Sequence, residues 1–486
     1  MAIYDEAKLV NIASGYKAAT YYSVLPDDGS GDFDVARNSV ATRVNSDIKL
    51  EEMAVHVPRI SYDSGVTCPY CLLEPQRTNL LTYGVSFLND YWGKSGATII
   101  GDATTVGSNI ITPNHGFESD TDSPPTAGNW HDIGNHAATA VADGTAPQGV
   151  NTCEVVASGA GGGGTNWFQW ANFGVGEIPI DKVYRVRFAA KSISGNTTLA
   201  VEYNGAGTSL LLTQTITGSW VYYDAWFYST IDDGARDLSF YVAGWGTFRL
   251  DDVSVMLTTG FSAPHADSPL DVSAFKLVES SATSTHYIQR SLTVTNGVAV
   301  TCSVLAKADE RTWLRFEETA AADGYYFDLT NGVIGTAIGT VDAYSITTLA
   351  DSWFRITITV TVPSTTAVFK AGLADADNSN SYSGDGSSGA YIAFAQLEEG
   401  AYPTSFAYSI AGGEGSTTTR IADVIDDAGA AATFNSVEGV LYTEIATLYS
   451  AETITRAITI SDGSTSNRVM IYFDNNANKV WGYTSS

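Results

Sequence analysis

Four aromatic residues carry the clearest potential for binding chemistry in this chain: Trp167, Trp170, Tyr203 and Trp245. Flat apolar rings can stack on the faces of sugar rings while a few polar groups fix the hydroxyls. Trp167 and Trp170 border a glycine-rich run at 159–164. They lie three positions apart, so in a strand they point to opposite faces and only one can serve as a platform. Packing in a protein core is the alternative use of each ring.

Catalysis of sugar cleavage would need a different pattern. Glycosidases usually place two carboxylates about 5–9.5 Å apart. Glu317-Glu318, Glu398-Glu399 and Asp251-Asp252 are adjacent pairs, and adjacent residues of a strand point to opposite faces. The six histidines show no zinc-binding spacing, and neither a G-x-S-x-G elbow nor a phosphate loop is found in the sequence. We therefore expect the chain not to be an enzyme.

The bulk composition excludes several partners. Asp and Glu outnumber Lys and Arg by 53 to 25, a formal net charge of −28, which repels nucleic acid and anionic lipid. No apolar run approaches the ~18 residues needed to cross a membrane, and the N-terminus lacks a signal-peptide pattern. We expect synthesis in a cytoplasm, no membrane insertion and reduced cysteines. One isolated C-x-x-C at 68–71 is a weak zinc signal.

Hydrophobic periodicity predicts an all-β fold. From residue 79 onward, runs such as 184–188, 354–360 and 457–460 alternate apolar with polar residues between Gly, Asn, Asp and Ser turns. Many short strands at regular spacing are typical of sandwiches or barrels. We predict multiple jelly-roll or concanavalin-like β-sandwich modules. A short mixed region at the N-terminus is expected to include one helix over 5–16.

An internal repeat suggests how these modules are arranged. The stretch 79–92 begins Asn-Leu-Leu-Thr and 109–130 begins Asn-Ile-Ile-Thr, and each continues with a Phe and then a Trp. Two opening strands therefore precede two complete bodies, at about 140–257 and 262–410. Insertion of one module into a loop of the other explains this order, because loop entropy grows slowly with length. A tandem arrangement is the alternative.

The nested interpretation gives the following predicted divisions. They are an N-terminal attachment or assembly region (1–78), an outer jelly-roll sandwich (79–106 plus 259–410), an inserted carbohydrate-binding-module-like jelly roll (107–258), a linker (411–420) and a partial concanavalin-like β region (421–486).

Several motifs point to a source for the chain. The stretch 68–83 reads Cys-Pro-Tyr-Cys-Leu-Leu-Glu-Pro-Gln-Arg-Thr-Asn-Leu-Leu-Thr-Tyr. Together with 32–44, 306–314, 381–389 and 396–405 it resembles tail-fibre and other virion structural proteins of bacteriophages. The resemblance implies a surface-exposed tail-fibre or head-fibre component of the virion, assembled in the host cytoplasm. It also implies other virion proteins as partners and a homotrimer as the oligomer.

The inserted module carries a second resemblance. Over 109–118, 184–191 and 248–255 it is similar to jelly-roll, galactose-binding-like carbohydrate-binding modules. In that family an acid after the first strand and an Asp on the last strand often hold a structural calcium ion. Carried over, these ligands are Glu118 and Asp251. Hard carboxylate oxygens suit calcium, and solvated strand-end acids are the alternative.

The two resemblances combine into one predicted function. We expect a phage fibre or appendage protein whose sandwich modules contact polysaccharide of the host surface, with weak single sites strengthened by multivalency. A purely structural decoration of head or tail is the alternative. A polysaccharide depolymerase is the third.

Overall fold

The structure is a computed structural model. It describes residues 7–17, 19–25, 27–88, 91–106, 108–111, 117, 130–134, 136–160, 167–173, 177–179, 182–204, 208–229, 236–259, 274–407, 416–429, 440–443, 445–446, 457–462, 464, 466–473 and 480–485. Apart from one 3-10 turn, η1 (Ala350–Ser352), every helix or strand in these ranges is a β-strand. The predicted all-β sandwich fold is therefore confirmed. No helix in the described ranges is long and apolar enough to span a membrane.

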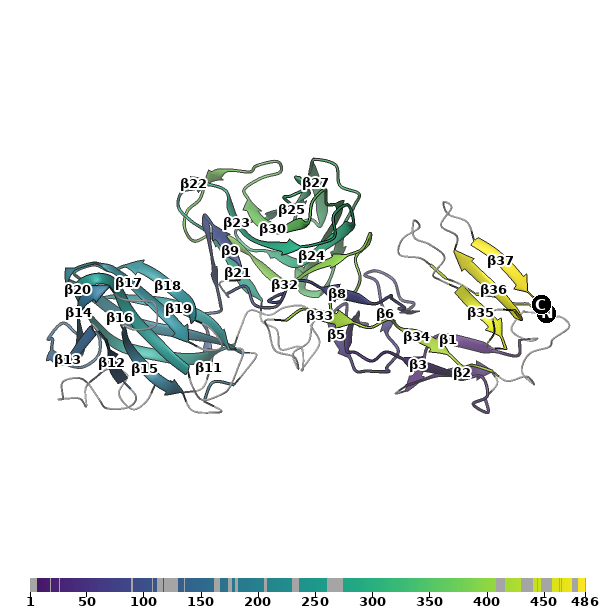
Figure 1. Ribbon diagram of the computed structural model, residues 1–486, viewed down its shortest axis with the longest axis horizontal. Coiled ribbons are helices and arrows are strands. Elements are labelled where there is room, and N and C mark those ends of the chain that lie inside the picture. The colour runs from purple at the N-terminus through teal and green to yellow at the C-terminus, as the bar shows by residue number, and fades with distance from the viewer. Residues whose placement is uncertain are drawn as a thin grey trace.

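The outer sandwich consists of two six-stranded sheets (Figure 1). One, here the β24 sheet, contains β10 (Ala97–Ile100), β21 (Phe275–Glu279), β32 (Gly389–Glu399), β24 (Ala299–Ala308), β29 (Phe354–Thr361) and β28 (Ala343–Thr348). The other, the β30 sheet, contains β27 (Val333–Ile338), β26 (Asp323–Asp328), β25 (Trp313–Glu318), β30 (Thr366–Ala374), β23 (His286–Thr293) and β9 (Gly93–Ser95). A short pair, β22 (Thr283–Ser284) and β31 (Tyr382–Ser383), lies beside them.

The inserted sandwich has two layers joined by one long strand, β20 (Arg236–Thr258). The first half of β20 belongs to the β17 layer, with β12 (Trp130–Ile133), β15 (Trp167–Phe173), β17 (Thr198–Asn204) and β18 (Thr208–Thr215). The second half belongs to the β16 layer, with β11 (Thr105–Val106), β13 (His136–Ala142), β14 (Asn151–Ala160), β16 (Lys182–Gly195) and β19 (Val221–Ser229).

Strand pairing shows that one sandwich interrupts the other. β9 and β10 precede the inserted strands in sequence, yet they pair with β23 and β21, which follow them. The connections enter and leave side by side, because Thr105 lies opposite Thr258 and the Thr259 N–H donates to the Thr104 carbonyl over 2.9 Å. The inserted module thus stands on a two-stranded stem. The exact domain limits stay a prediction.

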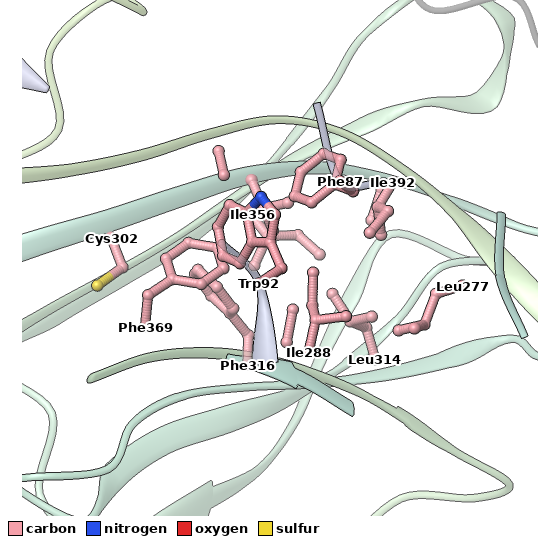
Figure 2. Close-up of a cluster of buried hydrophobic side chains, with 14 of the residues drawn as sticks. Phe87, Trp92, Leu277, Ile288, Cys302, Leu314, Phe316, Ile356, Phe369 and Ile392 are labelled. Atoms are coloured by element: carbon pink, nitrogen blue, oxygen red, sulfur yellow. The ribbon is translucent and has the colours of Figure 1, made fainter. Parts of the chain in front are cut away.

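Each sandwich buries an apolar core, and Val183 and Tyr228 of the inserted sandwich belong to the outer cluster. In the outer one, Trp92 sits between the sheets with its ring 5.1 Å from Phe87 and 5.4 Å from Phe369 (Figure 2). In the inserted one, Trp130 lies 5.3 Å from Phe117. The Phe and Trp of the sequence repeat therefore hold the same place in both cores.

The repeated asparagine explains the other half of that motif. The Asn79 side-chain oxygen accepts the N–H groups of Leu81 and Leu397, both at 3.1 Å, and its amide donates to the Ala395 carbonyl at 3.1 Å. Asn109 does the same in the inserted module: it accepts from Ile111 (3.1 Å) and Val255 (2.9 Å) and donates to Val253 (3.2 Å). One asparagine side chain in each module thus adds to the backbone hydrogen bonds, from Leu80 to Leu397 and from Ile110 to Val255, that join the opening segment to the last strand.

The last strands share an irregularity that accompanies this asparagine. Asp252 in β20 and Phe394 in β32 both have positive φ, 48° and 45°. The register of each strand shifts beside them, which is the behaviour of a β-bulge. Aligning the bulges makes Asp251 of the inserted module equivalent to Ala393 of the outer one.

The N-terminal region forms small sheets against the outer sandwich. Its strands are β1 (Val10–Lys17), β2 (Thr20–Leu25), β3 (Phe33–Ala36), β4 (Ala41–Val44), β5 (Leu50–Met53), β6 (Ile60–Ser61), β7 (Tyr70–Cys71) and β8 (Arg77–Asn79). The helix predicted over 5–16 is wrong for the described part, because β1 pairs with β2. Leu50 packs in one apolar cluster with Trp353 and Phe394 of the outer sandwich.

The predicted linker is wrong in its last residues. β33 (Thr418–Arg420) pairs with β8, and β34 (Val424–Asp426) pairs with β3. The chain therefore returns after the outer sandwich and completes the sheets of the N-terminal region. Beyond it, β35 (Ala457–Ser461), β36 (Arg468–Phe473) and β37 (Val480–Ser485) form a three-stranded sheet.

A buried charge cluster fastens this return segment, and we call it the clasp. It comprises Arg37, Arg59, Glu74, Arg420 and Asp423, whose side chains are 0–2% exposed. Asp423 accepts from Arg37 over 3.0 Å and also pairs with Arg59. Glu74 pairs with Arg59 over 2.6 Å and with Arg420 over 3.5 Å. The clasp therefore ties sequence positions more than three hundred residues apart.

Candidate functional site

The outward face of the β17 layer carries a row of polar side chains. Phe168 and Trp170 of β15 point into the core, 0% and 3% exposed, so Gln169 between them points outward. Gln169 lies opposite Ser239, and Ser239 lies opposite Glu202. The three side chains thus follow one another across three neighbouring strands. All three are less than a tenth exposed.

Hydrogen bonds organise this row. The Ser239 hydroxyl donates to the Gln169 side-chain oxygen (3.4 Å), and the Asn204 amide donates to the Ser239 hydroxyl (3.2 Å). The Tyr241 hydroxyl donates to Glu202 over 2.5 Å. Burial, together with that hydrogen bond, raises the pKa of Tyr241 well above its ordinary value. The face therefore offers fixed donors and acceptors beside an aromatic ring.

The outer sandwich repeats the row at the equivalent place. In the β30 sheet Gln289 lies opposite Lys370, and Lys370 lies opposite Glu317. Glutamine, a variable middle residue and glutamate again cross three neighbouring strands. Their neighbours Ile288 and Phe316 point into the outer core, both 0% exposed, so this row also faces outward.

The shared fold does not by itself explain why both modules have a glutamine and a glutamate at the same places on their outward faces. The core residues at these strands differ between the modules, as Phe168 does from Ile288, yet the glutamine and the glutamate are the same. Burying a carboxylate or an amide costs free energy unless partners are supplied. We take the shared row as the candidate site of both sandwiches, and call it the Gln–Glu row.

The aromatic residues predicted as platforms divide into three groups. Trp170 packs edge-on against Trp130 at 5.5 Å and 84°, and Tyr203 stacks on Phe227 at 4.0 Å, 5% exposed. Both rings point into the core between the layers and pack on other core rings, so the platform prediction is corrected for these two.

The remaining two predicted platforms stay open as predictions. Trp245 lies on β20 with 69% of its surface exposed, beside the exposed Val156 and Ile193 on the same layer. The backbone of Trp167 lies in β15, opposite Ile133, and its side chain lies outside the described part. The structure does not bring Trp245 to the Gln–Glu row, since it belongs to the β16 layer.

The predicted calcium ligands are described only in part. Glu118 lies outside the described residues. The Asp251 carboxylate is fully buried and accepts the N–H groups of Gln148 (2.9 Å) and Asp252 (2.8 Å). Calcium takes 6–8 oxygen ligands, and the described residues hold no group of three or more His, Cys, Asp or Glu able to bind a metal. Asp251 by itself therefore does not make a calcium site.

Carboxylate geometry at the rows bears on catalysis. Glu317 faces outward, whereas Glu318 points inward and accepts the N–H groups of Ala320 (3.1 Å) and Ala321 (2.7 Å). Each Gln–Glu row itself contains one carboxylate and therefore no pair of acids. The four cysteines are free thiols, and burial raises the pKa of Cys71 to about 12.

Sequence analysis missed the residues of both rows, although a signal was present. The aromatic residues at 167 and 287 are each followed by an apolar residue and then by glutamine. Aligning the two modules strand by strand would have found the shared glutamine. The glutamates needed the pairing register, because Glu317 stands next to an unrelated buried acid.

The chain matches no known protein family and no curated protein. Among solved structures, it is similar to the tandem CBM22-1–CBM22-2 domain of Xyn10C from Paenibacillus barcinonensis, with 14% identity over 61% of this chain and 99% of the other, TM-score 0.26. The xylan-binding CBM22-1 domain of the same protein gives 18% identity over 34% and 100%, TM-score 0.26.

Proposed function

We propose that the chain is a non-catalytic saccharide-binding protein, and that the Gln–Glu row of the inserted sandwich is a binding face. The observation that carries this proposal is the repetition of the row at equivalent register in both sandwiches. Two modules that have diverged in their cores retain the same amide and carboxylate on an outward face, which selection for a bound ligand explains.

The chemistry of the row suits hydroxyl groups. A glutamine amide offers both a donor and an acceptor, and a carboxylate accepts from two hydroxyls. Tyr241, Ser239 and Glu202 are already linked by register and hydrogen bonds, so binding would cost little ordering of side chains. A sugar, with an apolar face and many hydroxyls, matches such a surface.

The biological setting is proposed from the sequence resemblance. We place the chain on a bacteriophage particle as a homotrimeric fibre or appendage that contacts polysaccharide of the host surface. Weak single faces would give useful avidity when several copies engage one polymer. Locating the chain in intact particles, together with its mass in solution, tests this setting.

The binding proposal is tested on a glycan array with the purified full chain, followed by titration calorimetry on the neutral saccharides that bind. Gln169→Ala should weaken binding about tenfold, since a lost hydrogen bond costs ~1.4 kcal/mol. Gln76→Ala is the matched control, because Gln76 is exposed and lies in the N-terminal region. Trp245→Ala tests the exposed aromatic patch independently.

Two outcomes would contradict the proposal. An array without any bound saccharide favours the alternative, a decoration protein whose modules bind only neighbouring proteins. Release of reducing ends from a bound polysaccharide would favour a depolymerase instead.

A further inference from the structure

The Gln–Glu row of the outer sandwich has neighbours that its sister row lacks. We propose that this face of the β30 sheet is a second, separate binding site, and that it takes a saccharide bearing carboxylate groups. The inference rests on the proposed saccharide-binding function and goes beyond it by naming a different class of sugar for the second face.

Two cations flank the glutamate of this row. Arg315 lies 2.5 Å from one oxygen of Glu317, and the Lys370 amine lies 2.7 Å from the other. The three side chains are 16%, 3% and 14% exposed. These three side chains together carry a net charge of +1, although acids outnumber bases 53 to 25 in the whole chain.

Comparison of the two rows shows that the cations are specific to the outer sandwich. The middle residue is Ser239 in the inserted row and Lys370 in the outer one. Two positions before the glutamate stands Ala200 in β17 and Arg315 in β25. Both differences add a positive charge while the glutamine and the glutamate stay the same. The common frame would hold hydroxyls, and the added cations would select an anion.

An aromatic ring and a glycine lie next to these charges. The Lys370 amine lies 4.1 Å from the centre of the Tyr287 ring. Gly372 lies between Arg315 and Tyr287 across the same three strands, two residues along from the Gln–Glu row. A Cβ at this glycine would come within 3.1 Å of the Tyr287 side chain. The equivalent residue of the inserted sandwich is Tyr241, so the outer face has no side chain at the position where the inserted face has a tyrosine ring.

One N–H group of Arg315 has no hydrogen-bond partner. Its Nη1 donates to the Asn380 side-chain oxygen and its Nη2 pairs with Glu317, whereas Nε is buried without a hydrogen-bond partner. A guanidinium recognises carboxylates through paired N–H groups. A sugar carboxylate close to Arg315 and Lys370 would complete these contacts and offset their positive charge.

The experiment compares acidic polysaccharides with their uncharged counterparts. Alginate, polygalacturonate and hyaluronan, each beside its methyl ester, are titrated against the full chain and its variants. Lys370→Ser and Arg315→Ala introduce the residues that the inserted sandwich has at these positions, so the fold should tolerate them. Lys370→Arg is the control that retains the charge, and the unfolding temperature of every variant is measured.

We expect at least one acidic polymer to bind and its ester to bind at least about tenfold more weakly. Lys370→Ser and Arg315→Ala should each reduce acidic binding by a similar factor, and Lys370→Arg should not. Raising NaCl from about 50 to about 500 mM should weaken acidic binding, since salt screens charge. Neutral-saccharide binding, which depends on Gln169, should be unchanged.

The results separate this inference from the function on which it rests. Acidic binding that equals binding of the esters, or that ignores both substitutions, overturns the second site while the neutral site stands. Binding of neutral saccharides without binding of any acidic polymer would also overturn the second site and leave the neutral site in place. Absence of both kinds of binding removes the proposed function and the inference together.

Discussion

Asp423→Asn should loosen the clasp and lower the stability of the outer sandwich with the N-terminal region attached to it. Asp423 receives hydrogen bonds from Arg37 (3.0 Å), from Arg59 and from the backbone N–H of Glu74 (3.0 Å). The clasp contains three arginines and two acids, a net charge of +1. The substitution raises that charge to +2 without changing the size of the side chain.

The magnitude follows from the burial of these groups. Removing one partner of a buried ion pair leaves an uncompensated charge and costs about 3–5 kcal/mol. For a cooperative unit of about 150–250 residues, 1 kcal/mol shifts the unfolding temperature by ~2–4 °C. We therefore expect the outer sandwich, with the N-terminal region attached, to unfold about 6–20 °C earlier.

Differential scanning calorimetry of the full chain measures this shift. The inserted sandwich provides an internal reference, because it buries a large core of its own. Asp426→Asn is the matched control, since Asp426 lies three residues further on and is exposed. A shift for Asp423→Asn no larger than that for Asp426→Asn would refute the reasoning that the clasp holds the return segment.

Two further predictions concern acid and calcium. Burial alone would raise the pKa of Glu74, but the charges of Arg420 and Arg59 outweigh it and lower the pKa from 4.5 to about 2. The stability that the Glu74 carboxylate contributes is complete above pH ~4.5 and is lost as the pH falls towards 2. Urea titrations at several pH values should show this loss of unfolding free energy in the native chain and not in Glu74→Gln. Equal slopes of unfolding free energy against pH in the two proteins would contradict the prediction. If Glu118 and Asp251 hold calcium, adding calcium after chelation should raise the unfolding temperature of the inserted sandwich. Asp251→Asn should abolish that rise. If the native chain shows no rise, Asp251 serves only to accept the backbone N–H groups of Gln148 and Asp252.

Periodicity predicted the class of fold because it depends on local alternation. Sites such as 354–360 alternate over a whole strand and form β29. The repeat also indicated the nesting, since Trp92 and Trp130 mark the same core position. The helix expected over 5–16 failed because pairing with β2 decides the conformation there, and pairing between strands is not visible in local composition.

The candidate site was less accessible to prediction. Large aromatics drew attention to Trp170 and Tyr203, yet their size favours core packing, and both are buried. The residues of the rows are ordinary glutamines and glutamates in apolar surroundings. Only the register across three strands brings Gln169 to Glu202 and Gln289 to Glu317.

The two-stranded stem also affects how the protein would respond to mechanical pulling. Tension applied along the chain reaches Thr104 and can pass to Thr259 through the pairing of β11 with β20, without stretching the 154 residues between them. The inserted sandwich would then lie outside the part of the chain that carries the force. Force along the chain would therefore strain the outer sandwich before it strained the inserted one.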